Sequence, residues 1–523
     1  MKKLVVLFGV VLLAPLFFLS QQSSVNNVNG FTADPGSFEI LNSYQGRNNV
    51  IKVDVSKTEW NIIRYPLGQY RGKPISIELS ADVRREGSAG SIYWQLNDPP
   101  NYLTVSSHEY IESGQWHRVR VRAIISPMRN DTILYLSKWG ILPNTVFYIA
   151  NPVINITEGI SLTPDLTLTP LKDIYANHFL IGNITETGDL YMAGRRFDLM
   201  KHHFNVVTSF TYPFLLAPNK GSYNFTDADN MVNIALRNNI QVFGHTLVWH
   251  MYNPEWFTEG TREEIIQNLN NYITTVVRHF RGRINTYDVV NEAIREGLTA
   301  RDARGDWRNC LNDSVSRPNV FSPKNPWFEK LGADYVEIAF RAARTADPNI
   351  KLYYNDNNLE VNLHKAEAVC KMIQDINDRY KRETGGTRKL IEGVGYQMHV
   401  NFNMDFNIVR SSLEKLISLG IEVAITELDV SVGNEFIEGT GRDSVMSERD
   451  AITQALIYAR LMNLFREYSD HIVRVTFWGM TDNSSWLSVN NPALFDFHLN
   501  AKPAFFAVSD PDGFIIEHGG RRR

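Results

Sequence analysis

The feature that most constrains the fold of this chain is a regular alternation of strand-like and helix-like segments from about residue 171 onward. Eight short runs rich in apolar and β-branched residues are separated by amphipathic stretches such as Thr261–Phe280, Tyr335–Ala346 and Leu363–Tyr380. The runs are Phe179–Ile184, Phe204–Phe210, Gln241–Trp249, Asn285–Asn291, Lys351–Asn355, Gly393–His399, Glu422–Glu427 and Arg474–Trp478. They predict an α/β fold in which residues 171–515 form a (β/α)8 TIM barrel, with the functional side chains at the carboxyl ends of the strands.

The N-terminal third of the chain has a different pattern. Over residues 30–158, segments such as Ile75–Ala81 and Trp116–Arg122 alternate apolar and polar residues, and clusters of Gly, Pro, Asn and Asp separate them. This pattern predicts a smaller all-β sandwich of two sheets before the barrel. Residues 159–170 have neither a strand period nor a helix period, and we interpret them as a linker.

Residues 1–22 have the pattern of a signal peptide. Lys2 and Lys3 precede an apolar run from Leu4 to Leu19, and a polar stretch follows. We therefore expect a secreted protein, located in the extracellular space or the periplasm. Because the small-residue cleavage pattern is poor, an uncleaved N-terminal anchor is the alternative. No later segment is apolar enough to suggest further contact with a membrane.

Charge and cysteine content exclude several classes of protein. The net charge of −4 gives no electrostatic basis for binding nucleic acid. Cys310 and Cys370 are too few for a disulfide framework or a cysteine zinc site, and the sequence leaves their pairing open. His202 and His203 are adjacent, so they point apart, and no third ligand accompanies them. We therefore expect no metal and no cofactor.

Two carboxylates stand where strand-like runs stop. Glu292 follows Tyr287–Asn291 and Glu427 follows Val423–Thr426, so a barrel would bring both to one end. A single Glu at such a place is more often a cap or a salt-bridge partner. A pair facing one bond is what glycoside hydrolysis requires, since one protonates the leaving oxygen and the other attacks or activates water. Repulsion between the two charges should raise one of their pKa values.

Short motifs along the second half of the chain occur in the order found in a known enzyme family. With them, residues 171–508 resemble the endo-β-1,4-xylanase family of retaining (β/α)8 glycosidases called glycoside hydrolase family 10. The motifs are Gly244–His250, Asp288–Ala293, Tyr353–Asp356, Gln397–His399, Thr426–Asp429, Trp478–Asp482 with Trp486, and Lys502–Ala504.

The resemblance implies roles for individual residues. Glu292 would be the acid/base and Glu427 the nucleophile, with carboxyl groups about 5 Å apart. Asn291 would donate to the sugar 2-hydroxyl group, and His399 would hold the nucleophile. The other residues implied to bind substrate are His245, Trp249, Gln397, Trp478, Trp486, Phe210 and Phe214, and the supporting residues are Asp429 and Asn355. Trp249 could equally be a core residue, and His250 could be structural.

The chain departs from the family pattern after strand two. The family usually carries Glu-Asn-x-x-Lys there, to hold sugars on the non-reducing side of the cut, whereas this chain has Phe210, Thr211 and Phe214. Aromatic replacements favour contact with an apolar sugar face. Asn357 stands where the family often has Tyr, and the long segment Leu298–Trp327 after the acid/base would remodel the cleft. These departures put standard xylan specificity in doubt.

We therefore expect a secreted, monomeric, retaining endo-acting β-glycosidase that hydrolyses β-1,4-xylan or a decorated relative. One alternative is the same mechanism on a different β-linked glycan or glycoside, such as a methylated or deoxy sugar. The other is a non-catalytic polysaccharide-binding protein that kept the fold. The N-terminal module resembles family 22 carbohydrate-binding modules, and its alternative is a purely structural sandwich.

Overall fold

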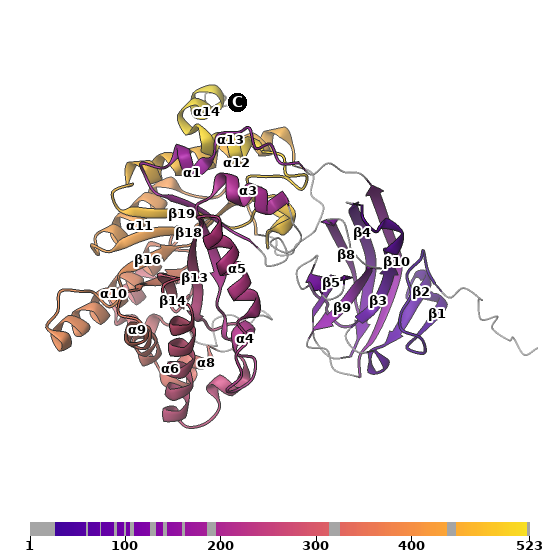
Figure 1. Ribbon diagram of the computed structural model, residues 1–523, viewed down its shortest axis with the longest axis horizontal. Coiled ribbons are helices and arrows are strands. Elements are labelled where there is room, and N and C mark those ends of the chain that lie inside the picture. Colours follow the sequence, from indigo (N-terminus) through magenta and orange to yellow (C-terminus); the bar gives the residue numbers. More distant parts are fainter. Residues whose placement is uncertain are drawn as a thin grey trace, which may run out of the picture.

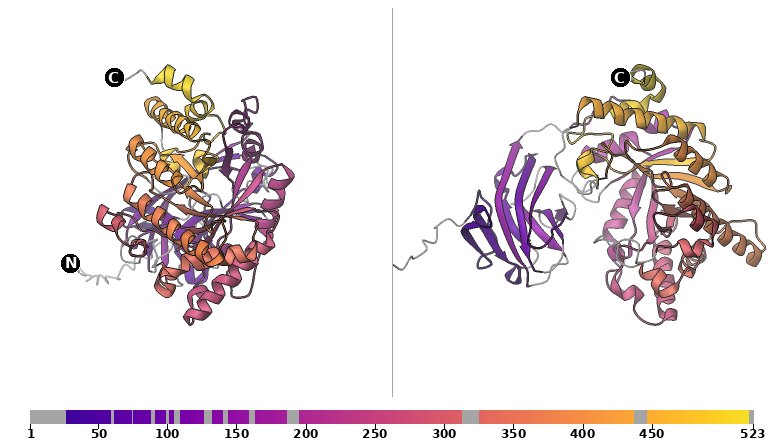
Figure 2. Two further views of the ribbon diagram at one scale, coloured as in Figure 1. Left: turned by 90° about the vertical axis from the view of Figure 1, so that its left-hand side faces the viewer. Right: turned by 180° about the vertical axis from the view of Figure 1, so that it is seen from behind.

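The computed structural model describes residues 27–58, 61–73, 75–87, 91–98, 101–104, 109–125, 132–139, 144–158, 163–185, 195–312, 325–436 and 446–519. Figures 1 and 2 show the β-rich N-terminal part and the larger part in which helices surround a central sheet. The predicted signal peptide 1–22 lies outside the described residues, as do residues 159–162 of the predicted linker and residues 313–324 of the segment after Glu292.

The larger part is a closed parallel barrel. Its strands follow one another in chain order around the sheet, and β16 pairs with β18 to close it. The strands are β11 Leu180–Ile184, β12 Val206–Phe210, β13 Gln241–Val248, β14 Thr286–Asn291, β15 Lys351–Asp356, β16 Gly393–Tyr396, β17 His399–Val400, β18 Glu422–Val430 and β19 Ile472–Phe477. The predicted barrel is confirmed, because each predicted strand coincides with an observed one.

Helices lie around the barrel and bury their apolar faces against it (Figure 1). Helix α6 (Arg262–His279) begins at a capping box in which Thr261 and Glu264 satisfy each other's backbone N–H groups. Helix α10 (Leu363–Thr384) is capped at its N-terminus by Asn362 and at its C-terminus by Gly385, whose φ of 65° suits glycine. The others include α1 Leu171–Ile174, α3 Arg195–His203, α4 Pro213–Leu216, α5 Thr226–Arg237, α7 Ala300–Arg304, α8 Pro326–Leu331, α9 Asp334–Ala346, α11 Phe406–Ile417, α12 Glu448–Glu467, α13 Pro503–Ser509 and α14 Pro511–His518.

The N-terminal domain consists of two antiparallel sheets, as predicted. One has the order β1-β2-β10-β4-β8, and the other has the order β3-β9-β5-β6, with β7 paired to β5. Trp94, Phe31 and Phe147 are fully buried among aliphatic side chains of this domain. The strands are β1 Phe38–Tyr44, β2 Arg47–Asp54, β3 Asn61–Pro66, β4 Ile75–Glu86, β5 Ser91–Asp98, β6 Asn101–Thr104, β7 Glu109–Tyr110, β8 Trp116–Ile125, β9 Ile133–Trp139 and β10 Val146–Glu158.

Two strand ends differ from the sequence-based expectation. The sixth barrel strand is interrupted, because Met398 adopts a φ of 65° between β16 and β17. Glu427 is not at the end of its strand, since β18 continues to Val430. The extension is explained by pairing, because His399 and Val400 in β17 lie opposite Asp429 and Val430.

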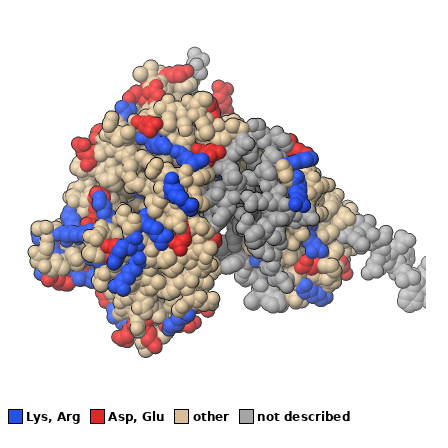
Figure 3. Space-filling view, in the orientation of Figure 1, with Lys and Arg blue, Asp and Glu red and all other residues tan. Residues whose placement is uncertain are grey.

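Surface charge, free cysteines and the search for membrane spans and metal sites test the classes of protein considered from the sequence. Basic and acidic side chains are interspersed over the barrel face shown in Figure 3, and neither sign forms a continuous field there. Cys310 and Cys370 are both free thiols. Within the described ranges, no helix combines the length and apolarity needed to cross a membrane, and no group of three or more His, Cys, Asp or Glu residues has metal-site geometry.

Candidate active site

Glu292 stands at the carboxyl end of β14 in an unusual backbone conformation. Its φ is 53°, a left-handed value that is uncommon for a residue other than glycine. Its N–H donates to the carbonyl oxygen of Asn355 at 2.9 Å. The Tyr354 hydroxyl accepts hydrogen bonds from the N–H groups of Ala293 and Ile294, at 3.0 and 3.2 Å. The neighbouring strand β15 thus holds the turn that positions Glu292.

Two side chains donate to the Glu292 carboxylate. Nε1 of Trp249 lies 2.9 Å from Oε2, and Nε2 of Gln397 lies 3.0 Å from Oε1. Trp249 is only half-buried, so it is a wall of the site rather than a core residue. Gln397 is 2% exposed and comes from the interruption between β16 and β17. Both residues, which the resemblance implies to bind substrate, therefore contact Glu292 directly.

The pKa of Glu292 corrects one expectation. Burial by itself would raise this pKa, but the charge of His250, the Gln397 hydrogen bond and the charge of Lys365 together lower it below its usual range. The unliganded site thus favours the ionised form, whereas repulsion from Glu427 was expected to favour the protonated acid. His250, which is 4% exposed, acts on Glu292 electrostatically instead of being merely structural.

Glu427 is buried in β18 and is held at both oxygens. Nδ2 of Asn355 donates to Oε1 at 2.7 Å, and Nε2 of His399 lies 3.2 Å from Oε2. The backbone N–H of Glu427 donates to the Gln397 carbonyl oxygen at 3.0 Å. The carboxylate is 5% exposed, so little water competes with these donors. Its orientation is therefore fixed by the protein.

Asn291, Asn355 and Gln397 link the two carboxylates through their amides. Oδ1 of Asn291 accepts from Nδ2 of Asn355 at 2.9 Å and from Nε2 of Gln397 at 3.2 Å. The same two nitrogens donate to Glu427 and to Glu292, respectively. Because Oδ1 accepts both of these hydrogen bonds, the amide nitrogen of Asn291 takes no part in them.

Asn355 has no freedom to turn. Its Oδ1 accepts a hydrogen bond from the Thr426 hydroxyl at 2.7 Å, and its side chain is fully buried. A Cβ atom at Gly395, in the adjacent strand, would lie only 2.0 Å from Oδ1 of Asn355. Glycine at position 395 is therefore required for this side chain to reach the site.

His399 lies between two carboxylates. Its Nδ1 is 3.0 Å from Oδ2 of Asp429, on the side opposite Glu427, and the same Oδ2 accepts from Nε1 of Trp486 at 3.1 Å. Burial alone would lower the His399 pKa, but the charges and hydrogen bonds of Asp429 and Glu427 raise it well above its usual range. Asp429 thus keeps His399 charged beside the nucleophile candidate, and Trp486 packs edge-on against the imidazole at 5.0 Å.

His245, like His399, is held by a buried aspartate. Its Nδ1 donates to Oδ2 of Asp288 at 2.8 Å, and both side chains are almost fully buried. Burial alone would lower the His245 pKa, but Asp288 and the charge of Glu427 raise it. The Trp478 ring lies 5.5 Å from His245 and 6.4 Å from His399, edge-on to each. The structure thus brings these predicted site residues together.

Phe210 lies at the end of β12 within an aromatic cluster, and Phe214 follows in α4. The Phe210 ring is 6.1 Å from that of Trp478 and stacks on Tyr212 at 5.3 Å. Both phenylalanines are half-buried, and the Phe214 N–H donates to the Tyr252 carbonyl oxygen at 3.1 Å. Sequence reasoning gave no role to Tyr212, Tyr252 or Asp288. Two sequence features could have indicated them. Aromatic residues are frequent after strands two and three, where Tyr212 and Tyr252 lie, and Asp288 is an acidic residue inside an apolar strand.

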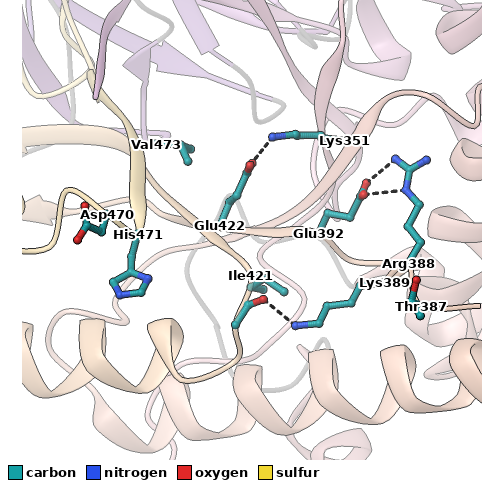
Figure 4. A pocket seen from close by; sticks show the side chains of 11 residues that line it. Lys351, Thr387, Arg388, Lys389, Glu392, Ile421, Glu422, Asp470, His471 and Val473 are labelled. Atoms are coloured by element: carbon teal, nitrogen blue, oxygen red, sulfur yellow. Dashed lines mark hydrogen bonds and ion pairs between the residues drawn. The ribbon is translucent and has the colours of Figure 1, made fainter. Parts of the chain in front are cut away.

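A cavity of about 610 Å³ lies at the opposite, amino-terminal end of the barrel strands (Figure 4). Four of its charged side chains form two ion pairs. Lys351 bonds to Glu422, and Arg388 lies 2.8 Å from Glu392. The Lys389 ammonium donates to backbone carbonyl oxygens. Side chains satisfied in this way stabilise the barrel, and the chemistry is concentrated at the other end.

The arrangement suits proton transfer combined with nucleophilic attack. One carboxylate is backed by a charged histidine, the other receives hydrogen bonds from an indole and an amide, and shared amides fix their mutual orientation. The indole rings of Trp478 and Trp486 lie edge-on to this histidine. These are the parts that acid-assisted cleavage of a glycosidic bond requires.

Residues 170–511 match the family model of glycosyl hydrolase family 10. Endo-1,4-beta-xylanase A of Thermoanaerobacterium saccharolyticum is 31% identical over 437 residues, which make up 80% of this chain and 34% of that protein. Exoglucanase XynX of Acetivibrio thermocellus is 30% identical over 478 residues, or 87% of this chain and 39% of that protein. The chain thus spans little more than a third of the length of these two relatives. Beta-1,4-xylanase of Dictyoglomus thermophilum is 31% identical, covering 66% of this chain and 91% of that protein.

Solved structures give the same grouping. A mutant of TsXylA, an intracellular xylanase from Thermoanaerobacterium saccharolyticum, in complex with xylotriose, has a TM-score of 0.56 and 31% identity, covering 65% of this chain and 98% of that one. A GH10 xylanase from termite gut that contains a bacterial Ig-like domain has a TM-score of 0.58 and 27% identity, covering 83% of this chain and 95% of that one.

Proposed function

The chain belongs to glycosyl hydrolase family 10, and we propose that it hydrolyses β-1,4-xylan or a decorated relative as a retaining endo-glycosidase. The observation that carries this proposal is the amide network of Asn291, Asn355 and Gln397, which couples Glu292 to Glu427. Relatives named as xylanases support the choice of xylan.

In the first step, Glu427 attacks the anomeric carbon. A bond forms between its carboxylate oxygen and that carbon while the glycosidic carbon–oxygen bond breaks, and Glu292 gives its proton to the leaving oxygen. The pKa of Glu292 is lowered in the unliganded site, so substrate must displace water and raise it before the proton can be given. As Glu427 loses its negative charge to the covalent bond, the pKa of Glu292 falls again.

In the second step, Glu292 acts as the base. It takes a proton from water, the water oxygen attacks the anomeric carbon, and the bond to Glu427 breaks with net retention of configuration. The lowered pKa of Glu292 suits this step, because a base must be ionised. Asn291, whose Oδ1 is already occupied by two donors, would use its amide nitrogen to hydrogen-bond the 2-hydroxyl group of the sugar, and Trp478 and Trp486 would flank the ring.

The deciding experiment measures release of reducing ends from unsubstituted β-1,4-xylan, with Glu427→Ala as the blank. Release by the wild type that disappears in the variant supports a xylanase. If neither protein releases reducing ends from any member of a panel of β-glycans, while the variant and the wild type bind one of them equally, the chain is a polysaccharide-binding protein instead.

The same mechanism on a different β-linked glycan is the second candidate. It is favoured by one observation, the aromatic cluster at Phe210 and Phe214, where the family usually has hydrogen-bonding residues. Cleavage of another glycan by the wild type but not by Glu427→Ala, with no cleavage of xylan, would select this candidate.

We also propose that the N-terminal sandwich binds polysaccharide. On the β1-β2-β10-β4-β8 sheet, Tyr44 stacks on Tyr148 at 3.9 Å and the Arg47 guanidinium lies 5.6 Å from the Trp116 ring. Aromatic rings beside charged donors suit a sugar chain. Depletion by insoluble xylan should be weaker for Glu427→Ala/Trp116→Ala than for Glu427→Ala. Equal depletion would leave the sandwich a structural role.

Secretion and a monomeric state complete the proposal. The signal-like residues 1–22 support export to the extracellular space or periplasm. Cell fractionation with N-terminal sequencing of the exported protein tests export and distinguishes cleavage from an uncleaved anchor. Light scattering after gel filtration tests the monomer, for which a mass near 59.8 kDa is expected for the full chain.

A further inference from the structure

Three aromatic rings next to the catalytic pair form a column that leads to the surface. Tyr212 stacks on Phe210 at 5.3 Å with an interplanar angle of 25°, and on Tyr252 at 5.3 Å with an angle of 19°. Trp249 lies 5.9 Å from Tyr212 and 5.4 Å from Tyr252. We call Phe210, Tyr212, Tyr252 and Trp249 the aromatic wall.

The aromatic wall begins at the reacting groups and ends in solvent. Its inner end is defined by the hydrogen bond from Trp249 to Glu292 and by the contact of Phe210 with Trp478. Its outer end is Tyr252, which is 52% exposed, and the side chain of Leu215 in α4 is 50% exposed. A glycan bound across Glu292 would therefore have one of its sugar residues against this wall.

The backbone around the wall is tied down. Tyr252 has a φ of 54°, and its carbonyl oxygen accepts the N–H of Phe214. The Asn253 side chain donates to the carbonyl oxygens of Trp249 and Met251, at 2.6 and 3.1 Å. The two loops after β12 and β13 are thus locked together, so the rings are ordered before substrate arrives and binding costs little conformational entropy.

The wall provides apolar contact and little polar recognition. The segment from Val206 to Pro218 contains no charged residue. The faces of Phe210 and Tyr212 that stack on each other are apolar contact surfaces. Such a surface gains from burying methyl groups, whereas the segment Val206–Pro218 supplies no charged partner to the hydroxyl groups of an unmodified sugar.

We propose that the aromatic wall is a subsite for a sugar residue whose hydroxyl groups carry apolar O-acetyl or O-methyl substituents. The inference rests on the proposed function, since it assigns a substrate class to the same cleft. Each methyl group buried there should raise kcat/KM roughly fourfold, the factor that corresponds to transferring one such group out of water.

The test compares matched substrates. Acetylated xylo-oligosaccharides and the same preparation after mild alkaline deacetylation differ only in the ester groups, and terminally O-methylated xylotetraose provides the ether counterpart. The wild type should show a kcat/KM ratio of at least about four for a substituted over an unsubstituted substrate. A preference for either the ester or the ether supports the wall and identifies the group. A ratio of one or below for both overturns it.

Variants locate the preference. Tyr252→Ala, at the exposed end, should bring the ratio close to one, and Phe210→Leu should lower it as well. Phe506→Ala is the matched control, because this exposed ring in α13 is 47% exposed and lies outside the aromatic wall. An unchanged ratio in Tyr252→Ala would overturn the assignment.

Failure of the proposed xylan hydrolysis can be distinguished from failure of the subsite proposal. If the wild type cleaves none of these oligosaccharides, the proposal of xylan hydrolysis is wrong. The subsite proposal is then tested by calorimetric titration of Glu427→Ala with the same oligosaccharides. Tighter binding of a substituted oligosaccharide than of its unsubstituted counterpart supports the wall, whereas equal binding or none overturns it.

Discussion

The Nδ2 atom of Asn355 donates to Oε1 of Glu427 at 2.7 Å, and this bond joins the end of β15 to the candidate nucleophile in β18. The same nitrogen reaches Asn291, the neighbour of the acid/base in sequence. The buried amide of Asn355 therefore positions both Glu427 and Asn291. We regard Asn355 as a positioning residue.

Replacing Asn355 tests this role. Asn355→Ala leaves the buried oxygens of Glu427 and Asn291 short of a donor, so unfolding should become easier by about 1–3 kcal/mol. We expect kcat to fall by at least about tenfold, because the nucleophile is no longer fixed. Asn377→Ala is the control. It loses two hydrogen bonds to Ile391, far from the carboxylates, and should lose stability while kcat changes less than twofold. Parallel losses of kcat in both variants would refute the positioning role.

Replacing the acid/base should discriminate between leaving groups. Glu292→Gln cannot donate a proton, so cleavage of xylan should fall by roughly 10²–10⁴-fold. Dinitrophenyl β-glycosides need little protonation, and their cleavage should fall far less in the first step. Steady-state and burst kinetics on both substrates measure the difference, and equal losses would contradict the assignment.

The pH profile should respond to His250. Its positive charge is one reason why the pKa of Glu292 is lowered, so His250→Asn should raise that pKa. Because the alkaline limb of kcat/KM follows the pKa of the acid in the free enzyme, this limb should move to higher pH. His279→Asn serves as the control, since this histidine pairs with Asp229 at 2.9 Å. An alkaline limb that stays in place, or moves equally in both variants, would exclude the electrostatic role.

Stability should depend on pH through Glu360. This carboxyl is fully buried, and no other described residue donates a hydrogen bond to it. Burial raises its pKa from 4.5 to about 7. A carboxyl with a raised folded-state pKa binds its proton more tightly when folded, so the folded state loses stability as pH rises from about 4.5 to 7. The loss amounts to about 3 kcal/mol.

Glu360→Gln removes this titration. The variant should melt at nearly the same temperature as the wild type at pH 4.5 and several degrees higher at pH 8, as measured by calorimetry. A difference in melting temperature that does not change with pH would show that Glu360 does not titrate in this range.

The fold, and the placement of two carboxylates at one end of it, were predictable because their signals are local. A parallel strand buried on both faces is a continuous apolar run, so each barrel strand was visible in the sequence. Glu292 and Glu427 follow such runs, and the fold then requires both to stand at one end. Strand bounds were less certain, since the extension of β18 to Val430 depends on pairing with β17, which sequence does not display.

The remainder of the site depends on loop conformation and charge. The stacking of Tyr212 on Tyr252 requires a left-handed residue at position 252, for which Tyr gives no signal. The lowered pKa of Glu292 results from surrounding groups on other elements, among them His250 and Lys365. Repulsion between the two carboxylates alone would raise one pKa, and these surrounding groups reverse the direction at Glu292.

The central claim is that Glu427 is the nucleophile of a double displacement assisted by Glu292. The most direct test treats the wild type with 2,4-dinitrophenyl 2-deoxy-2-fluoro-β-xylobioside, whose fluorine slows the second step, and maps the labelled peptide by mass spectrometry. We predict one covalent glycosyl group, attached to Glu427 and released when an acceptor sugar is added. Labelling of another residue, or no label from an enzyme that cleaves xylan to α-configured products, would contradict the account.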